Sequence, residues 1–338
     1  MTFDRFMKKL LLIFLVLIVI AFLIRGNVNS LISGKVVKEV NEDNIIPQDF
    51  GDINIYFCPQ DGCEDVLLSE IRKSENVDCA FFDLDLANLI DLIQKKDYRL
   101  ILDNSNLDNV RINFVRSDKR RSYMHNKFCI LDNSKVITGS MNPTKNDANR
   151  NNNNLIIIES KTLAGNYLDE FNEMWGGIYG KGSKVINPKI LFNGFLVENY
   201  FCPEDKCEEH VLNLLKEGRR MIYFMTYSFT SDEIGEELLK NYYYGIDVKG
   251  VFDKRQVGSK YSEYHRFKDI GMDVRLDNST AIMHHKVFIV DDVVIFGSYN
   301  PTKSGNENND ENILVMHDKE TAEKFVNEFN RIFNEEGV

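Results

Sequence analysis

The sequence predicts an α/β protein of two similar halves that pack about a pseudo-two-fold axis, preceded by a transmembrane helix. A motif-bearing segment occurs twice, over residues 123–158 and 282–315. A second repeat, YFCPQDGCEDVLLSEI from Tyr56 and YFCPEDKCEEHVLNLL from Tyr200, extends the duplication beyond that motif. An unbroken apolar run over residues 10–24 follows the basic residues near the N-terminus. The two repeats predict the halves, and the apolar run predicts the helix.

The apolar run indicates a membrane anchor. It is shorter than the ~20 residues typical of a span, although Phe6 and Met7 lengthen it. A cleaved signal peptide is the alternative, but no small-residue cleavage site follows the run. We therefore expect residues 1–30 to be an uncleaved signal anchor and residues 31–51 a polar linker. Basic residues before the run favour a cytoplasmic N-terminus, so we expect a single-pass membrane protein with an extracytoplasmic catalytic domain.

The two expected halves cover residues 52–185 and 186–338. Each reads as strand, helix, strand, motif strand, strand and closing helix, because apolar runs with strand and helix periods alternate in that order. The second half has extra residues around 253–271 that predict an additional helix. The first half has only a short polar loop there, so one rim of the expected site is lower.

Four of the six cysteines form two C-P-x-D-x-C elements at equivalent positions of the repeat: Cys58, Cys63, Cys202 and Cys207. Two local disulfides suit an extracytoplasmic domain, and this is the interpretation we favour. A four-thiolate zinc site is the alternative for a reducing compartment. The other two cysteines, Cys79 and Cys129, lie in apolar strands and are expected to pack in the core.

Each motif copy reads H-x-K, four residues, Asp, a short run and G-S-x-N-P-T-K. Side chains at i and i+2 of a strand share one face, so His and Lys of H-x-K lie together. If the copies face each other, one imidazole attacks phosphorus while the other protonates the leaving oxygen. Two lysines then hold the phosphate, and no metal or other cofactor is expected. The matched residues are His125, Lys127, Asp132, Ser140 and Asn142 in the first copy and His284, Lys286, Asp291, Ser298 and Asn300 in the second.

The doubled H-x-K-x4-D…G-S-x-N pattern resembles the phospholipase D superfamily, over roughly residue 52 to the C-terminus. It is most similar to the small nuclease-like members and the mitochondrial cardiolipin hydrolase type. The resemblance implies α-β-α sandwich halves and a phosphodiesterase that works through a phosphohistidine intermediate. Because both half-sites are in one chain, we expect a monomer.

The resemblance also implies roles for these residues. The histidines and lysines of both copies are expected to be catalytic. Asp132 and Asp291 end apolar runs before turns, so a supporting role is expected for both. The expected substrate-binding side chains are Ser140, Asn142, Ser298, Asn300 and Asn153.

At one aligned position of the two Asn-rich loops, the first copy has Asn153 and the second has Glu311. The resemblance implies that this residue reaches across to the other half, so that Glu311 holds His125 and Asn153 holds His284. A carboxylate stabilises the charged ring of a nucleophile, whereas an amide orients the ring without that charge. We therefore expect Glu311 to join the catalytic residues, His125 to attack, and His284 to act as the acid.

The net charge of −11 argues against a uniformly basic nucleic-acid-binding surface. A local basic cluster nonetheless borders the first motif, and it either attracts phosphate or only solvates the surface. Its members are Arg116, Lys119, Arg120, Arg121, Lys145 and Arg150.

Three functions are considered. We favour a membrane-anchored phosphodiesterase on DNA or RNA, most of all an endonuclease, because the halves carry few insertions. The alternative is a lipid phosphodiesterase or phosphatidyltransferase of the cardiolipin hydrolase or synthase type, which a membrane anchor would suit. The third is an inactive scaffold that binds phosphate polymers, against which the intact His and Lys of both copies argue.

Overall fold

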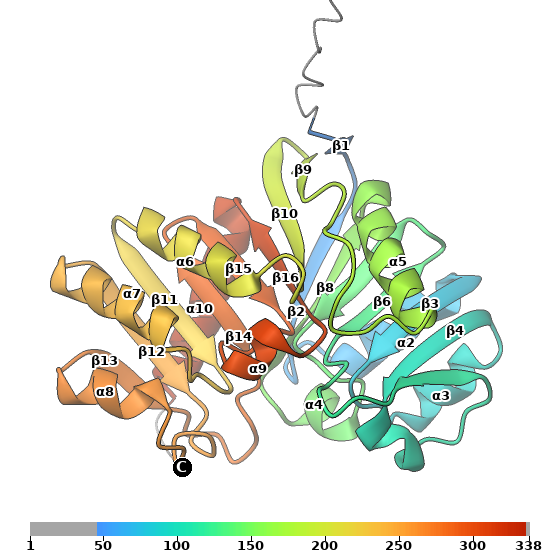
Figure 1. Cartoon of the computed structure of the whole chain (residues 1–338), viewed down its shortest axis with the longest axis horizontal. Coiled ribbons are helices and arrows are strands. Elements are labelled where there is room, and N and C mark those ends of the chain that lie inside the picture. Colours follow the sequence, from blue (N-terminus) through green and yellow to red (C-terminus); the bar gives the residue numbers. More distant parts are fainter. Residues whose placement is uncertain (1–45, 336–338) are drawn as a thin grey trace, which may run out of the picture. The chain divides into compact units, whose positions relative to one another are not determined.

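The structure is a computed structural model and describes residues 46–335. Its helices and strands follow one another from blue to red along the chain in Figure 1. The elements of the first half are β1 (Gln48–Asp49), β2 (Ile53–Cys58), α2 (Cys63–Lys73), β3 (Asn76–Phe81), α3 (Ala87–Ile93), β4 (Asp97–Asp103), η1 (Asn104–Asn109), β5 (Val115–Asp118), β6 (Lys127–Leu131), β7 (Lys135–Gly139), α4 (Lys145–Asn149), β8 (Asn153–Glu159) and α5 (Lys161–Trp175).

The second half repeats this series, but it has an α-helix between its fourth and fifth strands where the first half has the 3₁₀-helix η1. Its elements are β9 (Lys189–Phe192), β10 (Phe195–Cys202), α6 (Cys207–Glu217), β11 (Met221–Thr226), α7 (Asp232–Tyr243), β12 (Asp247–Phe252), α8 (Glu263–Asp269), β13 (Asp273–Leu276), β14 (Lys286–Val290), β15 (Val293–Gly297), α9 (Lys303–Glu307), β16 (Glu311–Met316) and α10 (Lys319–Phe333). Helix α8 lies in the segment where the sequence predicts an additional helix.

Both halves have the same sheet topology. The first sheet has seven strands in the order β2-β8-β7-β6-β3-β4-β5, and the second contains the same order in β10-β16-β15-β14-β11-β12-β13. In each sheet the motif strand, β6 or β14, runs antiparallel to both of its neighbours. Strands β9 and β1 extend the second sheet beyond β10. The predicted α/β class and the predicted duplication are therefore confirmed.

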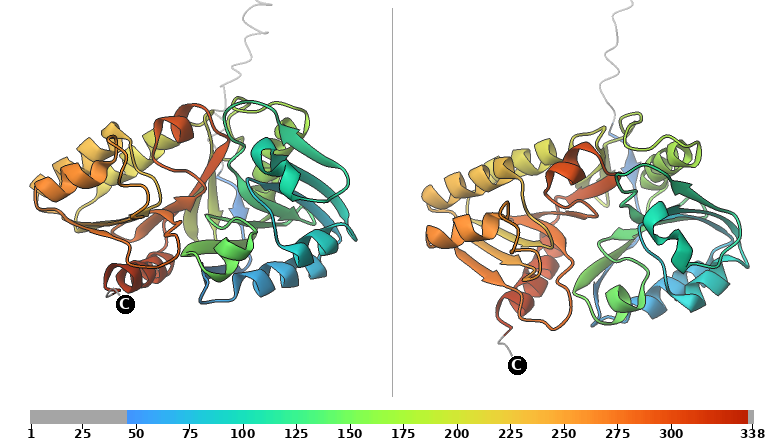
Figure 2. Two further views of the ribbon diagram at one scale, coloured as in Figure 1. Left: turned by 90° about the horizontal axis from the view of Figure 1, so that it is seen from below. Right: turned by 60° about the horizontal axis from the view of Figure 1, so that its bottom comes forward.

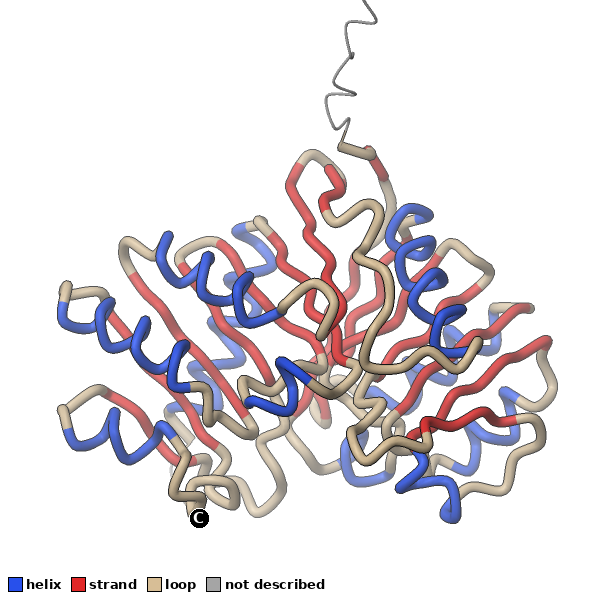
Figure 3. The backbone as a smooth tube through the Cα atoms, viewed as in Figure 1, coloured by secondary structure: helices blue, strands red, loops and turns tan. Residues whose placement is uncertain are grey.

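Helices cover both faces of each sheet, as the tube in Figure 3 and the two views in Figure 2 show. Helices α2 and α3 pack on one face of the first sheet and α5 on the other, while α6, α7 and α8 lie opposite α10 on the second. The central cluster includes the stacked rings of Phe296 and Phe325, whose centroids are 5.3 Å apart. Burying one such ring contributes roughly 1.5–3 kcal/mol, so this cluster fixes the two sheets against each other.

The two closing helices begin at residues whose side chains cap the helix N-terminus. The Ser160 hydroxyl accepts a hydrogen bond from Leu163 N at the start of α5, and the Asp318 carboxylate accepts one from Thr321 N at the start of α10. Such caps satisfy backbone donors that have no partner inside the helix. These two closing helices therefore begin at equivalent places in the two halves.

Residues 46–51 belong to the fold, although the sequence assigns them to the linker. Gln48 and Asp49 form β1, which pairs in parallel with Leu191 and Phe192 of β9. The Asp49 carboxylate also accepts hydrogen bonds from Thr162 N at 2.9 Å and from the Ser160 hydroxyl. This segment therefore joins the second sheet to the start of α5.

The predicted anchor, residues 1–30, lies outside the described residues, as does the linker up to residue 45. Within residues 46–335, no helix combines the length and the apolar character that a membrane span requires. The anchor therefore stays a prediction from the sequence.

All six cysteines are paired in disulfides. Cys58–Cys63 and Cys202–Cys207 are the two local bonds that the sequence favours over zinc. The third bond, Cys79–Cys129, was not expected, because core packing accounted for both residues. These two cysteines are directly opposite each other on the antiparallel strands β3 and β6, with their Cα atoms 4.1 Å apart. Strand pairing, rather than spacing in the sequence, therefore brings them together.

We expect the Cys79–Cys129 bond to stabilise the protein more than either local bond does. It closes a loop with a sequence separation of 50, against 5 for each of the others. Loop-closure entropy then predicts a loss of about 4 kcal/mol for Cys79→Ala with Cys129→Ala, and about 2 kcal/mol for Cys58→Ala with Cys63→Ala. Urea unfolding under oxidising conditions measures both, and equal losses would contradict the prediction.

Candidate active site

Two short segments bring the motif histidines to the seam between the halves. Met124 forms a β-bridge with Asp310, and His125 N donates to Asp310 O at 2.9 Å. In the same way Met283 forms a bridge with Asn152, and His284 N donates to Asn152 O at 2.8 Å. The Asn-rich loop of each half thereby fixes the backbone beside the histidine of the other half.

The two motif lysines lie on the seam immediately after the histidines. Lys127 and Lys286 are the first residues of β6 and β14, and both are buried. Each donates through Nζ to the carbonyl oxygen of its own motif histidine, at 2.8 Å for Lys286 and His284. Burial lowers the pKa of Lys127 to about 8, and burial together with Lys127 lowers the pKa of Lys286 well below its ordinary value. An anionic phosphate between them would favour their charged forms.

Phe82 and Tyr227 form an aromatic wall on each side of the site. They follow β3 and β11 at equivalent positions, with ring centroids 4.8 Å from His125 and 4.9 Å from His284, respectively. The Nζ atoms of Lys127 and Lys286 lie over these rings at 5.1 Å and 5.2 Å. Neither residue is part of the repeated motif, so the sequence did not indicate this wall. It orients the imidazoles and reduces their contact with water.

Glu311 lies beside His125, the contact that the resemblance implies. Its Oε2 atom is 2.8 Å from His125 Nδ1, and it also accepts a hydrogen bond from the Ser298 hydroxyl at 2.7 Å. Asn309 Nδ2 donates to the other carboxylate oxygen at 3.2 Å. Burial raises the pKa of Glu311 to about 7 and lowers the pKa of His125 well below its ordinary value. Burial disfavours the charged form of both partners. The hydrogen bonds around Glu311, rather than attraction between full charges, therefore hold the two side chains together.

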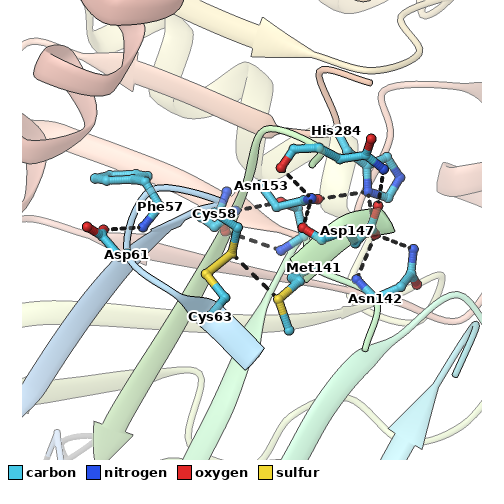
Figure 4. The surroundings of a disulfide bond; sticks show 12 residues. Phe57, Cys58, Asp61, Cys63, Met141, Asn142, Asp147, Asn153 and His284 are labelled. Carbon is cyan, nitrogen blue, oxygen red and sulfur yellow. Dashed lines mark hydrogen bonds and ion pairs between the residues drawn. A yellow bond between two sulfur atoms is a disulfide. The ribbon is translucent and has the colours of Figure 1, made fainter. Parts of the chain in front are cut away.

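His284 has two partners rather than the single amide that the sequence indicates. Asn153 Oδ1 is 3.0 Å from His284 Nδ1, and Asp147 Oδ2 is 3.3 Å from the same nitrogen (Figure 4). Asp147 lies on α4 and is buried. Burial and then Lys286 lower the pKa of His284 to about 4, although Asp147 opposes this shift. The expected contact between Asn153 and His284 is therefore present, and Asp147 is a second, charged partner that the sequence did not indicate.

The remaining motif side chains build the frame of the site. The hydroxyl oxygens of Ser140 and Ser298 accept hydrogen bonds from Asn154 N and Asn312 N of the neighbouring strands. Asn142 donates to Asp147 through both its backbone and its side-chain nitrogen. Its counterpart, Asn300, is only partly buried. Substrate contact by these residues, and by Asn153, stays a prediction.

Asp132 and Asp291 lie at the far ends of the motif strands, away from the histidines. The Asp132 carboxylate accepts backbone hydrogen bonds from Glu75 and Asn76, and that of Asp291 accepts them from Arg219, Arg220 and Met221. Both residues therefore tie the end of a motif strand to the loop before its neighbour.

His285 belongs to the seam rather than to the phosphate site. Its ring is fully buried and contacts Asn154 Nδ2 at 2.9 Å and Glu328 Oε1 at 3.2 Å. It therefore connects β8 of the first half to α10 of the second.

The basic cluster near the first motif divides into two groups. Arg120 forms ion pairs with Asp118 and Asp310, and Arg116 stacks over Trp175 at 4.2 Å. The other four are exposed and form no ion pair with any residue between 46 and 335. These four are Lys119, Arg121, Lys145 and Arg150.

Comparison with known proteins gives a consistent result. The family model described as "Cardiolipin synthase, PLD-like domain" matches residues 85–175 and 211–333. The protein named phospholipase D from Rickettsia felis is 28% identical over 196 residues, which are 52% of this chain and 94% of that protein. Mitochondrial cardiolipin hydrolase from Canis lupus familiaris is 32% identical over 126 residues, which are 37% of this chain but only 50% of that protein.

Among solved structures, phosphatidylserine synthase from Haemophilus influenzae has a TM-score of 0.64 with this chain at 14% identity. The alignment covers 82% of this chain and 86% of that chain. At this identity the similarity shows the fold alone.

We expect anion binding at the site to weaken as pH rises through about 8, because Lys127 then loses its charge. Sulfate is a suitable probe, because the ion keeps its double negative charge across the pH range in which Lys127 titrates. Calorimetric titration between roughly pH 6 and 9 measures the change, and Lys127→Arg should move it to higher pH because a guanidinium stays charged. Lys119→Met, at the exposed rim, is the control. An unchanged pH dependence in Lys127→Arg would contradict the assignment.

Proposed function

The chain belongs to the phospholipase D-like family and is a phosphodiesterase of the hydrolase class. Within this family, we propose that it is a membrane-tethered nuclease. The observation that carries the chemistry is the crossed arrangement at the seam. Each motif histidine is oriented through Nδ1 by the Asn-rich loop of the other half, with two buried lysines beside them. This leaves Nε2 of both rings for the reaction.

In the proposed first step, His125 Nε2 attacks phosphorus while Nδ1–H faces Glu311. The P–O bond to the leaving group breaks, and His284 Nε2 donates its proton to the leaving oxygen. In the second step His284 takes a proton from water, the water oxygen attacks phosphorus, and the P–N bond breaks. Lys127 and Lys286 neutralise the non-bridging oxygens throughout. The products are an alcohol and a phosphomonoester, and the enzyme returns to its initial state.

The position of β1, the first element of the described part of the chain, supports a substrate other than the anchoring bilayer. Toward one end of β10, Leu196 pairs with Leu191 of β9, which in turn pairs with β1. At the other end, Cys202 pairs with Glu311 at the site. At about 3.4 Å per residue the two ends are roughly 20 Å apart. Figure 1 shows β1 at one end of β10, with α4 and α9 at the other. An anchor before residue 46 would therefore join the domain at the end away from the site.

The surface chemistry also supports nucleic acid. Exposed cations lie on the two segments that flank the first half-site, namely Arg121 before His125 and Lys145 at the start of α4. The exposed ring of Tyr123 packs against Phe82 at 5.3 Å and offers a stacking surface. By contrast, the exposed apolar residues Ile46 and Phe50 flank β1. Phosphate attraction and base stacking are thus available at the site end.

Lipid cleavage is the second candidate function. The names of the relatives, phospholipase D and cardiolipin hydrolase, favour it. For either substrate we propose a single-pass, monomeric enzyme with an extracytoplasmic catalytic domain. The three disulfides support the extracytoplasmic location, because such bonds persist in oxidising compartments.

We expect the full chain, in detergent or nanodiscs, to cleave single-stranded DNA or RNA in excess EDTA, because histidines and lysines do the work of a metal. A panel of single-stranded, double-stranded and cardiolipin substrates measures the preference, with His125→Asn as the inactive control. Cleavage of lipid alone would replace the nuclease proposal. Activity that returns only on addition of magnesium would overturn the proposed mechanism.

We expect the two histidine variants to differ in a rapid acid quench with a phosphorus-labelled substrate. His284→Ala should still form labelled enzyme when the leaving group is a nitrophenolate, because such a group departs without protonation. His125→Ala should form none, since it lacks the nucleophile. Label on His125→Ala but not on His284→Ala would reverse the assignment.

A further inference from the structure

The duplication gives each residue of one half-site a counterpart in the other. The loop of the second copy provides Glu311 and Asn309, and the loop of the first copy has Asn153 and Asn151 at those positions. The loops also differ where Asp147 of α4 corresponds to Gly305 of α9. The first copy therefore has an amide where the second has Glu311, and a carboxylate where the second has Gly305.

The carboxylate that faces the histidine comes from different sequence positions in the two copies, but the asparagine that donates to it is equivalent in both. In the second copy, Asn309 Nδ2 donates to Glu311, whose other oxygen is 2.8 Å from His125 Nδ1. In the first copy, Asn151 Nδ2 donates to Asp147 Oδ1 at 2.6 Å, and the other oxygen of Asp147 is 3.3 Å from His284 Nδ1. The equivalent asparagine thus holds a carboxylate against a histidine in both halves.

The second copy has no space for this arrangement. A Cβ atom at Gly305 would lie 2.4 Å from the carbonyl oxygen of Asn300, closer than such atoms approach in proteins. Asp147 is instead held by hydrogen bonds from Asn142 N at 2.9 Å and Asn142 Nδ2 at 2.8 Å. Each histidine therefore has one carboxylate partner, supplied from a different position in each half.

We propose that Asp147 is a positioning residue that places a carboxylate beside Nδ1 of His284, as Glu311 does beside Nδ1 of His125. Asn153 keeps the hydrogen bond that fixes the His284 ring. This deepens the proposed function, on which it rests. A carboxylate beside Nδ1 favours the protonated imidazole, which is the form that donates a proton to the leaving oxygen. His284 is thereby suited to act as the acid although its loop carries an amide.

The charges around His284 show why such a partner matters. Lys286 and Lys127 both disfavour a proton on the ring, and burial does so more strongly. Tyr227 contributes only an aromatic face. Asp147 acts in the opposite direction. Burial by itself would raise the pKa of Asp147, and Asp83 faces it with a like charge, but His284 and the hydrogen bonds from Asn151 and Asn142 hold that pKa well below its usual range. Asp147 therefore stays ionised when His284 takes up a proton.

The test is the pH dependence of the full chain carrying Asp147→Asn. Loss of the charge should lower the pKa of His284, so the alkaline limb of kcat at saturating substrate should move to lower pH by about 1 to 3 units. Asn153→Asp in the same chain restores a carboxylate 3.0 Å from Nδ1 and should move the limb back. Glu311→Gln is the matched control, because it should change the acid limb that reports His125.

A purely structural role would give a different result. Asp147→Asn would then lower kcat by the same factor at every pH, Asn153→Asp would not restore it, and the proposal would be overturned. Titration of the His284 ring by NMR tests the same shift without any substrate. An unchanged midpoint there overturns the proposal even if no phosphodiester is cleaved, so failure of the proposed function remains distinguishable. Thermal melting of each variant confirms that it is folded.

Discussion

The contact of each motif histidine with a carboxylate across the seam is the constraint on which the structure depends. Two imidazoles and two ammonium groups are buried together, and burial penalises every charge among them. Asp147 offsets part of that penalty at His284, and Glu311 offsets part of it at both lysines. Each of these carboxylates contacts the histidine of the other half. Neither half can therefore complete its own site, and the two sheets must be held in one relative position by the core between them.

The strand ends next to the site are held by covalent bonds. Cys58 pairs with Asn153 across β2 and β8, and Cys202 pairs with Glu311 across β10 and β16. Each of these cysteines forms a disulfide with the first residue of the following helix. The bond at Cys58 also contacts Met141, next to Asn142, as Figure 4 shows. The residues that orient the histidines thus lie beside turns that a disulfide closes.

The two halves share a framework but differ where the reaction requires different roles. Strand order, the position of the lysines and the aromatic wall are the same in both. The partners of the histidines are not, because Glu311 titrates near neutral pH while the pKa of Asp147 lies well below its usual range. A nucleophile and an acid have different needs, so this asymmetry is consistent with a division of labour between two equivalent-looking rings.

The sequence by itself determined the features that depend on local pattern. Repeats reveal the duplication, and the two-residue period places His and Lys on one face. The repeated C-P-x-D-x-C elements, in a domain expected to be extracytoplasmic, favour two local disulfides over zinc. The sequence also identified Glu311 and Asn153 through the resemblance. Tertiary structure alone decided the Cys79–Cys129 bond, the pairing of β1 with β9 and the approach of Asp147 to His284. These contacts join residues far apart in the chain, and their distance depends on how strands and loops pack rather than on any local period.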